Sequence, residues 1–160
     1  MDIYTEAEIR SDISRIEILF RTNIFDSANI NNPLSFAAFI ETVIILRDLV
    51  KKCEIEGHKR IDFTDDIIIS SKIHDVTDLI EFVRNAVCHI NSPNSKIGNN
   101  RINCCCAVGK TKFIQINGKE ITSDYEDDIC YFFGEQKIYL IRHISRAFNE
   151  TRAILFPLLQ

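Results

Sequence analysis

Residues 84–89, Arg-Asn-Ala-Val-Cys-His, bring three side chains suited to phosphate chemistry into one short segment. Arg84 carries a permanent planar cation that can hold a phosphate through two hydrogen bonds. His89 carries an imidazole that can accept or donate a proton near neutral pH. Asn85 precedes His89 by about one helical turn and can orient the imidazole or a substrate. This set favours binding or cleavage of a phosphodiester, a reaction that these side chains can support without a metal ligand.

An amphipathic helix is expected to carry this segment. Apolar residues recur at helical spacing as far as Ile90, and Asp75 is suited to cap the start of the helix. The stretch Asn91-Ser92-Pro93 then stops the pattern. The sequence therefore predicts a helix over residues 75–90 with His89 near its C-terminal end, where the partial negative charge of the helix favours imidazolium.

Arg84, Asn85 and His89 match an Arg-Asn/Asp/His-x3-His pattern, and in this the chain resembles the HEPN superfamily (higher eukaryotes and prokaryotes nucleotide-binding domain). The resemblance covers the six-residue motif and the order of helices, over about residues 1–92 and 137–156. It implies a metal-independent RNase that works as a homodimer and needs no cofactor, with these three residues as its catalytic residues. It also implies a toxin-like or host-defence role, often under the control of an antitoxin or another regulatory partner protein.

The rest of the chain predicts a mainly α fold, namely a HEPN-like helical bundle formed by a single domain of residues 1–160. The expected main helices span residues 5–23, 33–54, 75–90 and 137–155, and a further short helix is expected within 62–73. Short strands are expected at 104–108, 112–116 and 129–133, as a small β-hairpin or sheet insertion over about residues 102–134, before the last helix.

The composition predicts a cytoplasmic protein without a membrane partner. A chain of 160 residues with 46% apolar and 26% charged residues suits one globular domain. No apolar run approaches the roughly 18 residues that a membrane span needs, and the first residues lack the pattern of a secretory signal. Three of the six cysteines are the neighbours Cys104, Cys105 and Cys106, which are poor disulfide partners for each other. Reduced thiols are therefore expected.

The charge is unevenly distributed along the chain. The net charge of −4 argues against a general nucleic-acid coat protein. Residues 96–119, however, contain five Lys or Arg and no acid, directly after the motif. This stretch is interpreted either as a solvated loop and hairpin or as a phosphate-attracting edge of the site, in which Lys96 and Arg101 bind RNA.

Three more arginines are candidates for RNA binding. Arg47 falls on the apolar flank of the second helix, where it either lays its stem on the core or serves as an interface or active-site cation. Arg142 and Arg146 lie one turn apart on the last helix and form either a solvated face or part of an RNA path. Cys104, Cys106 and Cys130 could join a histidine around zinc, but the chain has no C-x2-C pair, so no metal site is predicted.

Three interpretations of the motif follow. The first is an endoribonuclease; because Arg84 and His89 lie about 140° apart on a regular helix, a dimer would be needed to combine them. The second is a non-catalytic HEPN-like module that binds RNA or a protein partner. In the third the motif is coincidental: Arg84 pairs with an acid such as Glu81, and His89 caps its own helix by hydrogen bonding the last carbonyls.

Overall fold

A computed structural model describes residues 1–89, 91–116 and 118–159, with all side chains in these ranges except those of Cys104 and Lys119. Four α-helices, α1 to α4 in chain order, span Ile3–Arg21, Pro33–Glu56, Val76–Cys88 and Arg146–Leu155 within this part of the chain. The strands β1 to β7 span Lys96–Ile97, Asn100–Arg101, Asn103–Val108, Thr111–Ile116, Lys119–Ser123, Ile129–Phe133 and Gln136–Tyr139.

Polar caps fix the starts of three helices. Asp2, Asn32 and Asp75 each precede a helix, and a side-chain oxygen of each accepts a backbone N–H from the first turn. Pro33 occupies the first turn of α2, where its missing N–H has no partner to lose. The expected starts of α2 and α3, and the capping role of Asp75, are confirmed.

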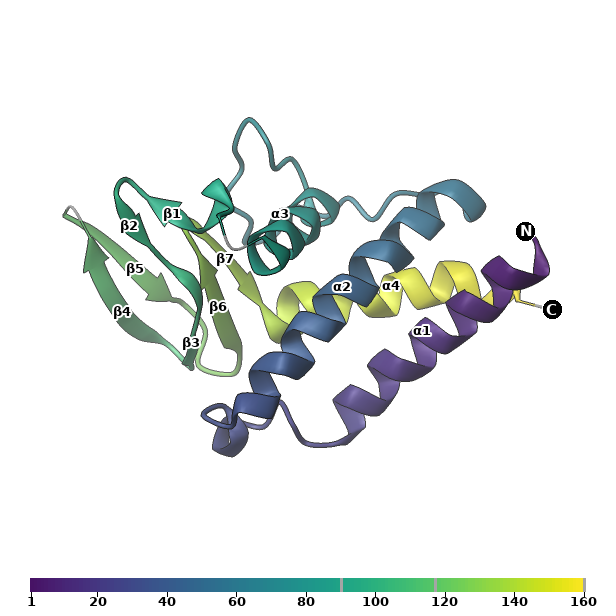
Figure 1. The fold of residues 1–160 in the computed structure, drawn as a ribbon, viewed down its shortest axis with the longest axis horizontal. Helices are drawn as coiled ribbons and strands as arrows, with labels where there is room; N and C mark the ends of the chain where they lie inside the picture. The colour runs from purple at the N-terminus through teal and green to yellow at the C-terminus, as the bar shows by residue number, and fades with distance from the viewer. Residues whose placement is uncertain (90, 117, 160) are drawn as a thin grey trace.

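The strands form a layer beside the helices (Figure 1). Strands β3, β6 and β7 make an antiparallel sheet with β6 in the centre, and β6 is buried along its whole length. Alternate side chains of β6 face opposite ways: Tyr131 belongs to the main core with the helices, whereas Phe132 belongs to a second core beneath the β4–β5 hairpin. Phe39 of α2 stacks on Tyr131 at a centroid distance of 3.7 Å, which joins the helices to the sheet.

The expectation of a mainly α helical bundle is wrong. The chain is a mixed α/β protein whose C-terminal half is rich in strands, arranged in three small antiparallel sheets within the described residues. The β region is also wider than the expected insertion at 102–134, since it begins at Lys96 and ends at Tyr139. The physical reason is that β6 needs a partner on each edge, so residues 136–139 pair with it instead of starting a helix.

The short helix expected within 62–73 is also absent from the described chain. This segment has a turn at residues 65–66, where Asp66 adopts a φ of +60°, and an isolated antiparallel bridge between Ser70 and Ile73. Its three consecutive isoleucines do not share one environment, because Ile67 is buried while the next two are exposed. An apolar run alone did not distinguish a helix from an extended segment.

The last helical segment starts as a π-helix over Leu140–Ser145. Both carboxylate oxygens of buried Asp128 hold its start, accepting the backbone N–H groups of Ile141 and Arg142 at 2.9 and 3.1 Å. His143 is fully buried in this turn; its Nδ1 accepts the N–H of Tyr139 at 3.1 Å, and its Nε2 lies 3.0 Å from the carbonyl oxygen of Asp65. The turn thus connects the sheet to α4.

Candidate functional site

A cluster of charged side chains holds the start of α3, the helix that carries the motif. Arg60 donates to both oxygens of Asp75, at 2.6 and 3.0 Å, and to Asp78 at 2.6 Å. Arg60 also pairs with Glu54 at the end of α2. The hydrogen bonds with Asp75 raise the pKa of Arg60 above its ordinary value. Sequence reasoning identified Asp75 as a cap but missed Arg60, which nothing near α3 in the sequence indicates.

Arg84 and Asn85 lie in the last turns of α3, and both are half-buried. An N–H of the Arg84 guanidinium donates to Oδ1 of Asn85 at 3.2 Å. No carboxylate of the described chain lies within ion-pair distance of Arg84, because Glu81 instead lies near Arg47 and Lys51, at 3.9 and 3.7 Å. The alternative in which Arg84 pairs with Glu81 is therefore not what the structure contains.

His89 is the residue that follows α3. Its φ of −122° and ψ of 108° are extended, so α3 ends at Cys88, two residues before the expected end at residue 90. Its backbone carbonyl accepts the N–H of Ser92 at 2.8 Å. The imidazole is exposed, and across residues 1–89, 91–116 and 118–159 no side chain or carbonyl makes a hydrogen bond to it. The capping role considered for His89 is therefore also not observed, and the ring is accessible to solvent.

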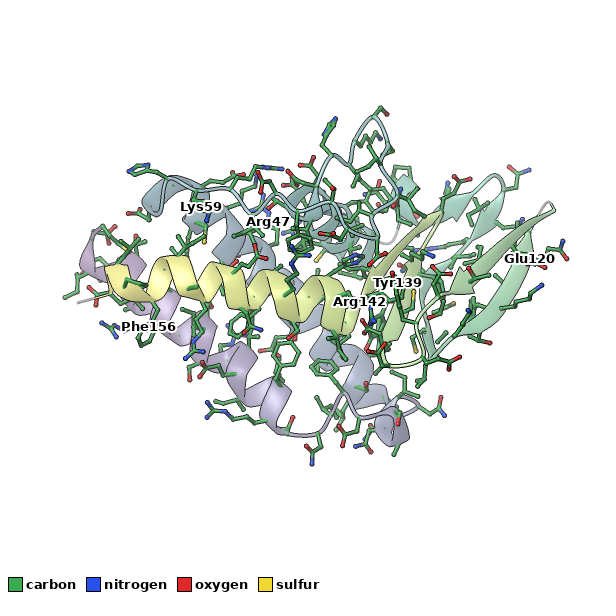
Figure 2. All side chains as sticks on the ribbon, turned by 180° about the vertical axis from the view of Figure 1, so that it is seen from behind. Arg47, Lys59, Glu120, Tyr139, Arg142 and Phe156 are labelled. Carbon is green, nitrogen blue, oxygen red and sulfur yellow. The ribbon has the colours of Figure 1, made fainter. Side chains whose placement is uncertain are left out.

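Carboxylates already compensate the charges of three candidate RNA-binding arginines, namely Arg47, Arg142 and Arg146. Arg142 lies where the chain leaves the sheet for α4 (Figure 2); it pairs with Asp127 at 2.9 Å and Asp128 at 3.1 Å, and its guanidinium lies 3.6 Å from the ring centroid of Tyr125. Arg142 is therefore part of a structural cluster and has little charge to offer a ligand.

Arg146 and Arg47 have acidic neighbours as well. Arg146 pairs with Asp65 at 2.8 Å and with Glu150 at 2.9 Å. Arg47 (Figure 2) is about one-third exposed and lies 3.1 Å from Asp48, while its Nε is buried without a hydrogen-bond partner among the described residues. This matches the interpretation in which the Arg47 stem covers the core.

Lys96 and Arg101 differ from these arginines. Both are exposed, on the short β1–β2 hairpin that follows the motif, and they are opposite each other in its register. Neither has a carboxylate within ion-pair distance in the described part of the chain. With Arg84, they are the predicted phosphate-binding cations whose charge no described carboxylate compensates.

The cysteine side chains that the structure describes do not gather around a metal position. Among the described residues, no three His, Cys, Asp or Glu side chains lie close enough to hold an ion. The side chain of Cys104, which the zinc alternative needs, lies outside the described part. Cys130 is buried, and burial raises the pKa of its thiol to about 12, so it carries a proton at neutral pH. Cys88, beside His89, is exposed.

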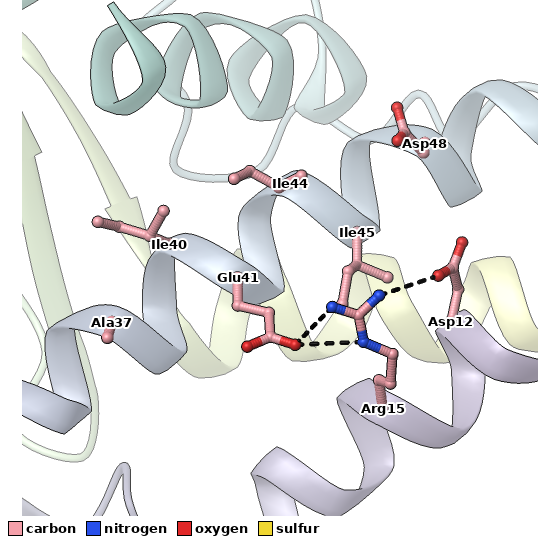
Figure 3. A pocket seen from close by; sticks show the side chains of 8 residues that line it. All are labelled: Asp12, Arg15, Ala37, Ile40, Glu41, Ile44, Ile45 and Asp48. Atoms are coloured by element: carbon pink, nitrogen blue, oxygen red, sulfur yellow. Dashed lines mark hydrogen bonds and ion pairs between the residues drawn. The ribbon is translucent and has the colours of Figure 1, made fainter. Parts of the chain in front are cut away.

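Residues of α1 and α2 line a groove of about 370 Å³ (Figure 3). Arg15 spans it, pairing with Glu41 at 2.7 Å and Asp12 at 3.7 Å, and isoleucines of α2 line its upper wall. No motif residue lines this groove, and its charged residues Arg15, Asp12 and Glu41 are already paired with one another. It is therefore not the candidate site.

Within the described residues, no helix combines the length and apolar character needed to cross a membrane. Comparisons of the chain with protein-family models, curated proteins and solved structures return no match. The candidate site therefore rests on the residues themselves.

Proposed function

We propose that this protein is a metal-independent endoribonuclease that acts in the cytoplasm as a homodimer, in a toxin-like or defence role under the control of a partner protein. The observation that carries the proposal is the contrast among its cations. Among the described residues, Arg84 has no carboxylate partner and the exposed imidazole of His89 has no hydrogen-bond partner, whereas Arg47, Arg142 and Arg146 are compensated. The two residues that the chemistry needs are those that remain available. The resemblance of the motif to HEPN RNases supports the same assignment.

The reaction is an attack of the RNA 2′-hydroxyl oxygen on the adjacent phosphorus. The 2′-oxygen–phosphorus bond forms as the bond from phosphorus to the 5′-oxygen breaks, which leaves a 2′,3′-cyclic phosphate and a 5′-hydroxyl. His89 takes the proton of the 2′-hydroxyl or supplies one to the leaving 5′-oxygen. Arg84 stabilises the negative charge that develops on the phosphate oxygens. Asn85, which already accepts a hydrogen bond from Arg84, positions that guanidinium.

Two copies explain how Arg84 and His89 would act on one phosphate. Arg84 projects from the body of α3, and the chain turns away from the helix at His89. In a symmetric dimer that pairs two α3 ends, Arg84 of one protomer can meet His89 of the other. The proposal therefore predicts a shared site and an inactive monomer.

A non-catalytic RNA-binding or protein-interaction module is the second candidate. It is favoured by the fact that no described residue hydrogen bonds the imidazole of His89, so nothing within one protomer fixes its orientation. In such a module Arg84 and the hairpin cations would bind an anionic partner without cleaving it.

The test is RNA cleavage in EDTA by the wild type, Arg84→Ala and His89→Ala, with the dimer checked by light scattering. Loss of general acid–base catalysis should lower the rate of His89→Ala by about 10²–10⁴-fold. His74→Ala and Arg21→Ala, exposed residues of the same types elsewhere, should cleave at the wild-type rate. Equal background in all five proteins, with the dimer intact, would contradict the nuclease proposal.

Mixing Arg84→Ala with His89→Ala tests the shared site. If each site takes Arg84 from one protomer and His89 from the other, every mixed dimer has one intact site, so random mixing restores about a quarter of the wild-type activity. If both residues of a site come from the same protomer, every site lacks one residue and mixing restores nothing.

A further inference from the structure

The β1–β2 hairpin presents two cations on one face. Lys96 and Arg101 are direct partners in its antiparallel register, so their side chains leave the same side of the ribbon, about 5 Å apart at Cβ. The neighbouring Ile97 points the other way and is buried in the second core. Gly98 has a φ of +56° in the two-residue turn, a conformation that glycine adopts without strain. Because side chains alternate between the two faces of the hairpin, both charged side chains point outward.

The base of this hairpin is fixed to the rest of the protein. Ser95 and Ile102 are buried, and the N–H of Ile102 donates to the carbonyl of Ser95 at 2.7 Å. The N–H of Gly134, in the β6–β7 turn, donates to the carbonyl of Ile102 at 2.9 Å. The side-chain amide of Asn94 donates to the carbonyl of Phe82, in α3, at 3.0 Å. The hairpin is thereby held in a set position relative to the helix that carries Arg84.

Two like charges opposite each other destabilise a strand pair. In the β4–β5 hairpin, by contrast, the exposed Lys112 of β4 forms an ion pair with Glu120 of β5 at 3.0 Å. Lys96 and Arg101 have no acid partner among the described residues. The sequence also contains no Asp or Glu between Phe82 and Lys119, a stretch that includes Arg84 and both hairpin cations. An anionic ligand would supply the missing counter-charge.

We infer that the β1–β2 hairpin is a binding site for the phosphate backbone of single-stranded RNA, with Lys96 and Arg101 as its two phosphate contacts. Because the hairpin begins seven residues after His89 and Asn94 ties its base to α3, we assign it as the subsite that holds the strand next to the scissile phosphate. This inference rests on the proposed function for its choice of RNA as the ligand. Both cations contact phosphate oxygens and not base edges, so the subsite adds affinity without sequence preference.

The experiment measures binding of a 12-nucleotide 2′-O-methyl oligouridine, which lacks the attacking hydroxyl, at increasing KCl concentrations. Each phosphate contact in a single strand contributes about −0.7 to the slope of log K against log salt. Lys96→Gln with Arg101→Gln should therefore reduce the steepness of that slope by about 1.4. The charge-preserving swap Lys96→Arg with Arg101→Lys should keep the wild-type slope. Circular dichroism of each variant checks its fold.

The matched control removes two exposed arginines from α1, which lies on the opposite side of α2 from β1 and β2 in Figure 1. Arg10→Gln with Arg21→Gln makes the same change in net charge and should leave the slope unaltered. An equal fall of the slope in both double variants would assign the effect to net charge and overturn the inference, as would an unchanged slope in the hairpin variant. Absence of wild-type binding to the oligomer at low salt would overturn it too.

Two further measurements test this inference separately from the nuclease proposal and distinguish RNA from another anionic ligand. Cleavage of unmodified RNA by the wild type is scored independently: binding that depends on the hairpin without cleavage supports the subsite and contradicts the nuclease, and cleavage with an unaltered slope does the reverse. A polyglutamate peptide serves as a competitor. If it binds with the same hairpin dependence while the RNA oligomer does not, the ligand is an acidic protein segment and the RNA assignment is overturned.

Discussion

Replacing Gly134 with alanine should destabilise the protein because the β6–β7 turn packs directly against the base of the β1–β2 hairpin. A Cβ atom at residue 134 would lie 2.7 Å from the carbonyl oxygen of Asn94 and 2.9 Å from that of Lys96. Both neighbours are backbone atoms, so the chain itself must shift. The φ of +57° adds a second cost, since left-handed backbone costs about 1–2 kcal/mol for a residue with a Cβ.

The two contributions give a magnitude. Forcing an extra methyl group into a well-packed region costs about 1–3 kcal/mol, so with the left-handed conformation the total loss is about 2–5 kcal/mol. Gly118 offers a matched control, because its φ is +78° while nothing lies within 4 Å of an added Cβ. Gly118→Ala should therefore show only the conformational part, about 1–2 kcal/mol.

The assay is urea unfolding at equilibrium, followed by circular dichroism, for the wild type and both alanine variants. The difference between Gly134→Ala and Gly118→Ala isolates the packing contribution and is expected to be about 1–3 kcal/mol. Equal destabilisation of the two variants would refute the claim that the hairpin base packs tightly on this turn. It would also remove the reason for treating Lys96 and Arg101 as fixed relative to α3.

Two further predictions concern the turn that leads into α4. Asp128→Ala removes a fully buried carboxylate that accepts three backbone N–H groups and pairs with Arg142, so urea unfolding should show a fall in the free energy of unfolding of about 3–5 kcal/mol. The control Asp127→Ala removes only the exposed partner of Arg142 and should lower it by less than about 1 kcal/mol. Similar losses for the two variants would contradict this account. Burial lowers the pKa of His143, so the unfolded chain binds that proton more readily than the folded protein, and the free energy of unfolding should fall as the pH drops below about 6.5. His143→Phe should reduce the dependence of the free energy of unfolding on pH between about pH 6.5 and 5. An unchanged dependence would show that His143 does not take up a proton on unfolding.

The sequence located the candidate site through local pattern. The apolar spacing and the Asp75 cap placed α3 within two residues of its observed ends, and so placed Arg84, Asn85 and His89 at the end of a helix. The sequence also predicted the start of α2, the start of α1 to within two residues, and the strands near 104–108, 112–116 and 129–133. These features depend on residues within one or two turns or strands of each other, which is the range over which periodicity and capping act.

The fold class could not be derived in the same way. The helical spacing that begins at Ile141 predicted a last helix from residue 137, but residues 137–139 belong to strand β7 because β6 has a free edge to pair. Strands β1 and β2 are only two residues long and mostly polar, so they have no pattern to recognise. Their hairpin exists because Ser95, Ile97 and Ile102 are buried against distant parts of the chain.

The sequence alone determined which residues could do phosphate chemistry, because residue type and local spacing fix the available side-chain groups. Only the tertiary structure decided which of them are free to do it. Arg146 is compensated by Asp65, 81 residues away, and Arg142 by Asp128, 14 residues away, whereas Arg84 hydrogen bonds to the amide of its neighbour Asn85 and has no carboxylate partner in the part of the chain that the structure describes. Ion pairs form between side chains that the fold brings within a few ångströms, and that distance bears no fixed relation to their separation in the chain.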